Sequence, residues 1–398
     1  MHLSPSATHH FDYVIVGGGI FGCYAALYLA GRGAKVCIVE KEQQLFQKAS
    51  LVNQARLHSG YHYPRSIATA ALSDAHKARF TEEHRDFIHF SFEQYYAIDR
   101  FGSFTTPLQF ERFCAYLNIR CESVKEHPLF NFDRIECLYR TEEYTFDPVM
   151  LRAYYTQKVE NTVGITVIKN SEISKAIQEG NKWRLEVNPS TALALTVKKP
   201  LFIDSFSKNV LILQAETVIN ATYSAINAIN QVFGLNTLDL THEISEMAYV
   251  DAPAFRDKGL TVMDGPFGSI MPYGKSGILS LSSVIYTHHK ISYEQLPHFD
   301  CQSPEAPECK PEAPGICTDC IRRPESNAPK MIRQMQRYFD DQVQMTHLFS
   351  YFTIKTKLKA NHIDDGRPTE ISKLHHQPNF YCLFSGKINS IYEIENII

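Results

Sequence analysis

The chain has 398 residues, of which 44% are apolar and 21% charged, with 40 basic against 43 acidic residues and a formal net charge of −3. This length and balance predict a globular protein of two or three domains. The lack of a strong field of one sign argues against nucleic acid as a partner.

The sequence shows no recognisable targeting or membrane-spanning segment. The first ten residues are polar, unlike an export signal, and the longest apolar stretch, residues 13–30, is interrupted by four glycines. Ten cysteines in such a chain favour a reducing compartment. We therefore expect a cytoplasmic protein with no transmembrane segment.

The clearest motif lies in the first forty residues. Residues 12–16 form a short β-rich run, residues 17–22 read Gly-Gly-Gly-Ile-Phe-Gly and fit G-x-G-x-x-G, and residues 23–30 carry small and apolar side chains at helical spacing. Residues 35–39 predict a second strand, which ends at Glu40. A strand, a glycine turn, a helix and an acid after the next strand together predict a dinucleotide-binding unit.

Each part of this motif has a physical task. We expect Gly17 to allow a tight turn, Gly19 to admit a pyrophosphate to the backbone, and Gly22 to let the helix pack on the sheet. Glu40 is placed to bind ribose hydroxyls. The motif leaves FAD, NAD and a glycine turn without a ligand open, and its position near the start of the chain favours FAD. The residues predicted to bind the cofactor here are Gly17, Gly19, Ile20, Phe21, Gly22, Glu40 and Lys41.

A polar segment, residues 53–66, follows the second strand. It holds two histidines, two arginines and two tyrosines without a helical or alternating apolar pattern, so packing alone does not explain it. The segment resembles the D-amino acid oxidase superfamily, and in particular its L-2-hydroxyglutarate oxidase branch. The matching residues are Asn53, His58, Ser59, Gly60, Tyr63 and Pro64.

The resemblance implies that this segment runs under a flavin ring. Gly60 then permits close approach to the ring, and Asn53 contributes to the cofactor site. His58 or His62 acts as the base beside the reacting carbon, and either arginine of the segment binds a substrate carboxylate. A polar surface loop and covalent attachment of flavin through one histidine are the alternatives. The candidate catalytic residues are Arg56, His58, His62, Tyr63 and Arg65.

Two later regions resemble the same superfamily. A strand at residues 164–168 contacts the adenine in relatives, and another that ends near Ala221 returns to the pyrophosphate. A strand at residues 379–384 and a glycine turn then deliver a helix N-terminus to the flavin pyrimidine, where its dipole stabilises negative charge on the reduced ring. Lys387 adds positive charge there, unless it is a solvated side chain. The cofactor-binding candidates of these regions are Val167, Ala221, Gly386, Lys387 and Ile388, with Arg367 near the flavin.

The order of elements predicts an α/β fold with two domains. The first is a Rossmann-like FAD-binding domain, with a parallel sheet and a β-meander, assembled from residues 1–90, 145–238 and 360–398. The second is an α+β substrate domain with a mixed or antiparallel sheet, made from residues 91–144 and 239–359. A Cys-rich insertion at residues 297–329 belongs to the second domain.

The insertion contains four cysteines within twenty residues. Cys301, Cys309, Cys317 and Cys320 have the number of thiols that a tetrahedral structural zinc requires. Only the last pair shows the usual C-x2-C spacing. A structural zinc and free or oxidised thiols are both open from the sequence.

The resemblance implies an FAD-dependent oxidoreductase. Its reaction is oxidation of a C–H bond beside an amine or hydroxyl of a small molecule, such as an amino acid or 2-hydroxy acid, by hydride transfer to flavin N5. The electron acceptor is open between oxygen and a quinone or other carrier. Three alternatives stay open: a flavin-dependent mutase or isomerase, an NAD-linked enzyme, and a non-catalytic FAD-containing assembly protein that docks through the Cys-rich insertion.

Overall fold

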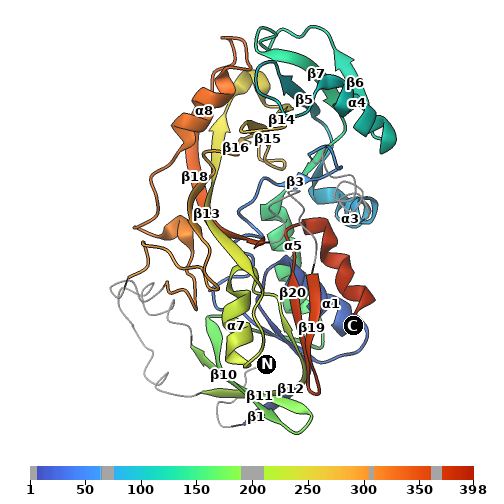
Figure 1. Cartoon of the computed structure of the whole chain (residues 1–398). Helices are drawn as coiled ribbons and strands as arrows, with labels where there is room; N and C mark the ends of the chain where they lie inside the picture. Colours follow the sequence, from blue (N-terminus) through green and yellow to red (C-terminus); the bar gives the residue numbers. More distant parts are fainter. Residues whose placement is uncertain (1–6, 63, 65–75, 190–209, 304–308, 360–369) are drawn as a thin grey trace.

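The computed structural model describes residues 7–62, 64, 76–189, 210–303, 309–359 and 370–398. Two large sheets occupy the two ends of an elongated molecule, and β13 (Leu240–Asp251) and β18 (Thr346–Leu358) run from one end toward the other (Figure 1). The parallel strands of one sheet and the antiparallel strands of the other confirm the predicted α/β fold with a second, largely antiparallel layer.

The first sheet has eight strands. Its parallel centre runs in the order β9, β2, β1, β12, β20, and the hairpin β10–β11 joins the outer half of β12 as an antiparallel meander. The strands are β1 (Thr8–Val16), β2 (Val36–Val39), β9 (Ile165–Ile168), β10 (Ser171–Glu179), β11 (Lys182–Pro189), β12 (Leu211–Asn220), β19 (Glu370–His376) and β20 (Asn379–Phe384).

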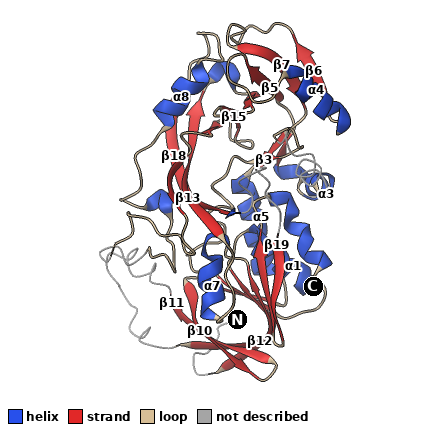
Figure 2. Cartoon of the chain, in the orientation of Figure 1, coloured by secondary structure: helices blue, strands red, loops and turns tan. Residues whose placement is uncertain are grey.

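Apolar side chains on both faces explain why the central strands are buried. Ile15 and Ile38 pack toward α1 (Ile20–Gly31) and α5 (Pro148–Asn161), whereas Val14 and Val39 pack toward the meander and Phe233. Such runs are typical of parallel strands covered on both sides. The helices α1, α5 and α7 (Ile226–Val232) surround this sheet in Figure 2. The carboxyl ends of β1 and β2 are thereby left at one edge, next to the N-terminus of α1.

The second sheet has nine strands and lies over that edge. Its order is β17, β13, β16, β15, β14, β5, β7, β6, and β18 pairs with β13 along its whole length. Helices α4 (Pro107–Tyr116) and α8 (Ala328–Gln336) flank it (Figure 2). The remaining strands are β5 (Glu93–Asp99), β6 (Cys121–Val124), β7 (Ile135–Thr141), β14 (Lys258–Met263), β15 (Gly268–Pro272), β16 (Leu279–Ser283) and β17 (His288–Ser292).

A small three-stranded sheet connects the two large ones. β8 (Tyr144–Phe146) pairs with β3 (Arg56–Leu57) on one side and with β4 (Ile88–His89) on the other. The short helices α3 (Lys77–Glu83) and η1 (Arg85–Phe87) precede β4. This sheet holds the polar segment of residues 53–62 between the glycine turn and the second sheet. No helix among the described residues is long and apolar enough to cross a membrane.

Candidate active site

The polar segment and the glycine turn share one cavity of about 640 Å³, a size typical of ligand sites. Its walls come from the carboxyl ends of β1 and β2, the start of α1, the loop before β3, β10, the turn after β12, the Cys-rich segment and the turn after β20. The predicted residues that line it are Gly17, Gly19, Ile20, Phe21, Glu40, Lys41, Asn53, Arg56, His58, Ala221, Gly386, Lys387 and Ile388.

The glycine turn has the close approaches that its motif predicts. Gly17 has φ +103°, and a Cβ there would lie 2.8 Å from the carbonyl oxygen of Ala221. A Cβ on Gly22 would overlap the carbonyl oxygen of Gly17, so only glycine lets α1 start this close to the turn. Gly19 precedes α1 and supplies no capping side chain. The hydroxyl of Ser50 accepts a hydrogen bond from the N–H of Ile20, the first residue of α1, at 3.1 Å. The start of the helix lines the cavity, where its dipole favours an anion such as a pyrophosphate.

Glu40 lies at the carboxyl end of β2, in the cavity wall. Its two carboxylate oxygens accept hydrogen bonds from the backbone N–H groups of Gly18 at 2.6 Å and Glu42 at 2.8 Å. Burial raises the pKa of Glu40. The side chain is thus fixed at the end of the strand, at the position from which an acid binds ribose hydroxyls in such motifs.

Val167 lies outside the cavity. It pairs with Ile38 on the neighbouring strand and is not among the residues that line the wall. The chain turns after β9 at Asn170, which has φ +53°, and the backbone N–H of Ser171 donates to the carbonyl of Glu40. Residues 171–174 at the start of β10 line the cavity instead, because this turn brings them, rather than β9, to the end of β2.

Lys41 connects the cavity to the Cys-rich segment. Its Nζ donates to the carbonyl of Ala313 at 2.6 Å and to that of Pro314 at 3.2 Å, and the Nζ of Lys48 donates to Pro314 at 2.8 Å. Burial lowers the pKa of Lys41 to about 8. Lys48 also forms an ion pair with Glu42. Two lysines thus hold residues 313–314 over this part of the cavity.

Asn53 shapes the loop that precedes β3. Its side-chain N–H group donates to the carbonyls of Ala49 and Ser50, and its oxygen accepts from the N–H of Ala55 at 2.7 Å. Ala55 adopts φ +56°, which a side chain rarely does. Asn53 therefore fixes the turn that sends the chain into β3, while one side of the residue lines the cavity.

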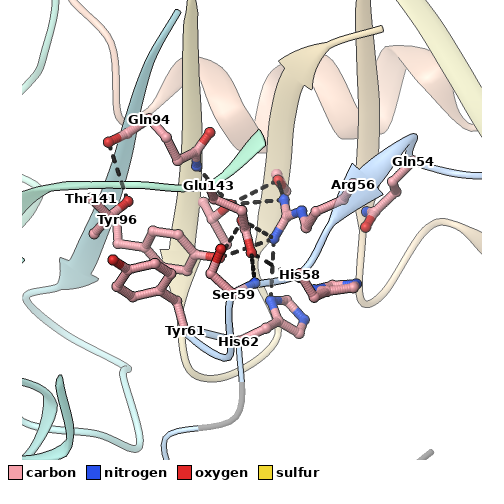
Figure 3. Close-up of polar contacts among 12 residues, drawn as sticks. Gln54, Arg56, His58, Ser59, Tyr61, His62, Gln94, Tyr96, Thr141 and Glu143 are labelled. Carbon is pink, nitrogen blue, oxygen red and sulfur yellow. Dashed lines mark hydrogen bonds and ion pairs between the residues drawn. The ribbon is translucent and has the colours of Figure 1, made fainter. Parts of the chain in front are cut away.

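Arg56 is held in a buried network and not free for a ligand (Figure 3). One guanidinium nitrogen lies 3.2 Å from the hydroxyl of Tyr96, and the other donates to Thr261 at 2.9 Å and to Ser269. Glu143 lies 3.5 Å away, and the side chains of this pair are 1% and 0% exposed. Arg56 was predicted to bind a substrate carboxylate, but strands β5, β14 and β15 already occupy both terminal nitrogens.

His58 and His62 differ in their surroundings. His58 lines the cavity, and its Nδ1 lies 3.8 Å from a carboxylate oxygen of Glu143. His62 is exposed, outside the cavity wall, and its Nδ1 lies 3.5 Å from Arg56. Gly60, with φ +94°, forms the turn between them and does not line the cavity. Tyr63, Arg65 and Arg367 fall outside the described residues.

The turn after β20 places a lysine in the cavity wall. Lys387 is buried, precedes the 3₁₀ helix η6 (Ile388–Asn396), and its carbonyl accepts from the hydroxyl of Ser390 at 2.7 Å. The solvated alternative for this side chain is thereby excluded. Lys355 of β18 lines the same cavity. The carboxylates in the wall, by contrast, lie on the segments around the end of β2 and are Glu40, Glu42, Glu172 and Glu312.

The structure does not support the predicted zinc site. No three His, Cys, Asp or Glu side chains of the described chain are grouped to hold a metal ion. Cys301 and Cys317 instead pack against the apolar cluster around Phe352, and burial raises the pKa of the Cys317 thiol to about 12. The sulfur of Cys309 accepts from the N–H of Gly315 at 3.3 Å.

Several site residues were not predicted. Tyr96 and Glu143 complete the Arg56 network, and Ser50, Lys48 and Lys355 contact or line the cavity. Tyr96 comes from β5 and Glu143 from the turn before β8, so only strand pairing brings them to β3. The local sequence signal for Glu143 was the pair of adjacent acids at residues 142–143, which precedes a β-rich run.

The fold and this cavity define the class of protein as an oxidoreductase that binds FAD across the edge of a Rossmann-type sheet. The model of the FAD dependent oxidoreductase family (DAO) matches residues 12–222, more than half of the chain. The chain belongs to this family and is an FAD-dependent oxidoreductase, which decides between the two dinucleotides that the glycine motif left open.

Solved structures of similar fold include two oxidases. The match to glycine oxidase from Geobacillus kaustophilus covers 96% of this chain and 91% of the oxidase chain, with a TM-score of 0.64 and 16% identity. L-alpha-glycerophosphate oxidase from Mycoplasma pneumoniae, with FAD bound, covers 98% and 94%, with a TM-score of 0.67 and 15% identity. Identities this low show a shared fold.

Curated relatives are similar over shorter stretches. FAD-dependent monooxygenase FPY4 of Fusarium mangiferae is 24% identical over 275 residues, which are 69% of this chain and 64% of the relative. The mitochondrial L-2-hydroxyglutarate dehydrogenase of Nematostella vectensis is 39% identical over 73 residues, which are 18% of this chain and 16% of the relative. The match thus spans less than two thirds of each relative's length.

Proposed function

We propose that the chain oxidises a C–H bond beside an amine or hydroxyl of a small carboxylic acid, such as an amino acid or 2-hydroxy acid. Bound FAD supplies the hydride acceptor at flavin N5. The observation that carries the substrate class is the charge of the cavity. Lys355, Lys387 and His58 lie in the wall away from β2, whereas its carboxylates cluster around β2. An anionic substrate is favoured where the wall is cationic.

The cofactor then lies along the cavity from β2 to the turn after β20. Gly17, Gly19 and the first N–H groups of α1 bind the pyrophosphate, and Glu40 accepts hydrogen bonds from the ribose. Residues 171–174, rather than Val167, border the adenine. The buried cation of Lys387 attends the flavin and favours negative charge on it. These roles are proposals that rest on which residues line the wall.

The reacting part of the substrate lies near His58. His58 takes the proton from the substrate amine or hydroxyl, because it is the histidine of the polar segment that reaches the cavity. Lys355 replaces Arg56 as the proposed partner of the substrate carboxylate, because both terminal nitrogens of Arg56 are bound to strands of the second sheet. The cytoplasmic location and the domain bounds stay predictions.

The test combines an absorbance spectrum with a substrate screen. We expect flavin bands that acid precipitation releases into the supernatant, and anaerobic bleaching by members of a panel of amino acids and 2-hydroxy acids. The matched uncharged amines and alcohols should bleach the flavin much more slowly. Bleaching by the uncharged panel alone would contradict the proposed substrate class, and flavin retained in the pellet would show a covalent link. Repeating turnover with oxygen and with a quinone dye identifies the acceptor.

A further inference from the structure

We propose that Glu143 is the positioning residue of His58: a buried carboxylate that orients the imidazole and stabilises the positive charge it gains as a base. The inference rests on the proposed function, in which His58 accepts the substrate proton. Glu143 does not line the cavity and so does not touch substrate or cofactor. Its action is through His58.

The geometry places Glu143 behind the polar segment (Figure 3). One carboxylate oxygen lies 3.8 Å from Nδ1 of His58 and accepts a hydrogen bond from the backbone N–H of Ser59 at 3.3 Å. The other accepts from the hydroxyl of Tyr96 at 2.8 Å and lies 3.5 Å from Arg56. The same carboxylate therefore contacts both the side chain and the backbone on which the ring of His58 is mounted.

Its partners hold the Glu143 side chain in place. A carboxylate with no exposed surface is costly unless it is paired and hydrogen-bonded. Burial raises the pKa of Tyr96 well above its ordinary value, so its hydroxyl stays a donor. Arg56 is tied in turn to Thr261 and Ser269 on two strands of the second sheet. The carboxylate is thus part of a rigid network and not a mobile side chain.

This arrangement assigns the two nitrogens of His58. Nδ1 lies 3.8 Å from the carboxylate and makes no hydrogen bond there. We assign the ring proton to this nitrogen, which leaves Nε2, on the opposite side of the ring, as the basic nitrogen. In the reaction the O–H or N–H bond of the substrate breaks and its proton goes to Nε2, while the carbon loses a hydride to the flavin. The imidazolium that forms lies beside a carboxylate, which lowers the free energy of that state.

Other charges face His58 and act against Glu143. Arg56 and His62 are close on the same segment, with the two imidazole centroids 5.9 Å apart. Lys77 reaches Ser59 from α3, with Nζ 2.6 Å from the hydroxyl, and Lys355 and Lys387 line the same cavity. Positive charges near an imidazole oppose its protonation, so we expect the ring to be a weaker base without Glu143.

The experiment is an NMR titration of the histidines of the holoenzyme, with His58 assigned through H58Q. In E143Q we expect the pKa of His58 to fall by about one unit, the shift typical of losing an opposite charge this close. The acid limb of kcat/KM moves to lower pH by the same amount, and kcat falls about 10- to 100-fold, part of what a general base contributes. E142Q is the matched control, because Glu142 is the exposed neighbour.

The outcomes separate this inference from the proposed function. An unchanged His58 pKa in E143Q overturns the positioning role. Full activity in H58Q overturns His58 as the base, even where the titration shows that Glu143 controls its pKa. If E143Q loses FAD or unfolds, E143D takes its place in the experiment. E143D keeps the carboxylate but moves it farther from His58, so the pKa of His58 should fall by less than one unit. A pKa in E143D at or above the wild-type value again overturns the inference.

Discussion

Tyr223 adopts a left-handed backbone conformation, with φ +56°, at the turn after β12. Such a conformation costs a residue with a side chain roughly 1–2 kcal/mol. Its hydroxyl bonds to both the N–H and the carbonyl of Thr356, and its ring stacks on Phe384 at 5.5 Å. These contacts with β18 and β20 offset the strain and hold the turn in place.

Lys387 carries the first prediction at this scale. K387M removes a buried cation from the cavity wall. We expect the midpoint potential of the bound flavin to become more negative and its reduction by substrate to slow about tenfold or more, because positive charge stabilises the reduced ring. Redox titration and stopped-flow bleaching measure both. K41M removes a charge near β2 and should leave the potential unchanged; an equal shift in both variants would contradict the proposed position of the flavin.

Single residues were predicted well only where the signal was local. Asn53, Arg56 and His58 share one short segment with a polar composition that packing does not explain, and all three reach the cavity. The role of Arg56 was not predictable, because Tyr96 and Thr261 reach it from strands distant in sequence. Val167 does not line the cavity, because the chain bends at Asn170 after β9, and that bend leaves no clear mark in the sequence.

At the scale of elements, the position of α1 requires the start of the helix to pack directly against the glycine turn. A Cβ in G22A would overlap the carbonyl oxygen of Gly17, so we expect FAD affinity to fall at least tenfold and the free energy of unfolding to drop by about 1–3 kcal/mol. G31A is the control at the other end of the helix, where a Cβ meets nothing within 4 Å.

G31A should be more stable by up to about 1 kcal/mol, because alanine loses less backbone entropy than glycine in a helix. FAD titration and chemical denaturation of both variants test this pair. Normal FAD binding by G22A would show that the turn and α1 can separate without cost to the site.

The pairing of β13 with β18 contains a buried histidine. Nδ1 of His242 lies 2.9 Å from the hydroxyl of Thr356, and burial lowers its pKa to about 4. The unfolded chain binds this proton near pH 6.5. The unfolded state therefore binds more protons between pH 6.5 and 4, and the free energy of unfolding falls as the pH is lowered through that window.

We expect a loss of up to about 3 kcal/mol from this residue over that range. Denaturant titrations between pH 7 and 4 measure it, and H242Q should give a shallower slope. If the slope of H242Q equals that of the wild-type chain, residues other than His242 cause the acid sensitivity. His84 contributes in the same direction, because burial also lowers its pKa.

At the scale of the whole molecule, the periodicity of the central strands and the glycine motif predicted the Rossmann-type sheet, and the resemblance of the polar segment at residues 53–66 predicted the family. The pairing of β13 with β18 and the three-stranded sheet that carries Arg56 were beyond prediction, since each joins segments far apart in sequence. Of the two alternatives left open for the Cys-rich insertion, structural zinc is not supported, because no three potential metal ligands among the described residues are grouped to hold an ion.

Segments from across the chain form the walls of one cavity, so we expect FAD binding to stabilise the whole fold. A ligand that binds only the folded state adds about 2.7 kcal/mol at a hundredfold excess over its Kd. We expect the melting temperature of the flavin-free chain to rise in one cooperative step as FAD is added, and to stay constant with NAD. A rise confined to one of two separate transitions would show that the sheets unfold independently.

The walls of the cavity also set the order of events during synthesis. A nascent chain that has emerged through β2 already carries the glycine turn and Glu40, yet Lys387 and Ile388 are still to be translated. We therefore expect tight binding of the cofactor only when all of these segments are in place, in a chain whose two sheets have met. A cell short of riboflavin would then accumulate full-length, unliganded copies, and quality control would decide their fate.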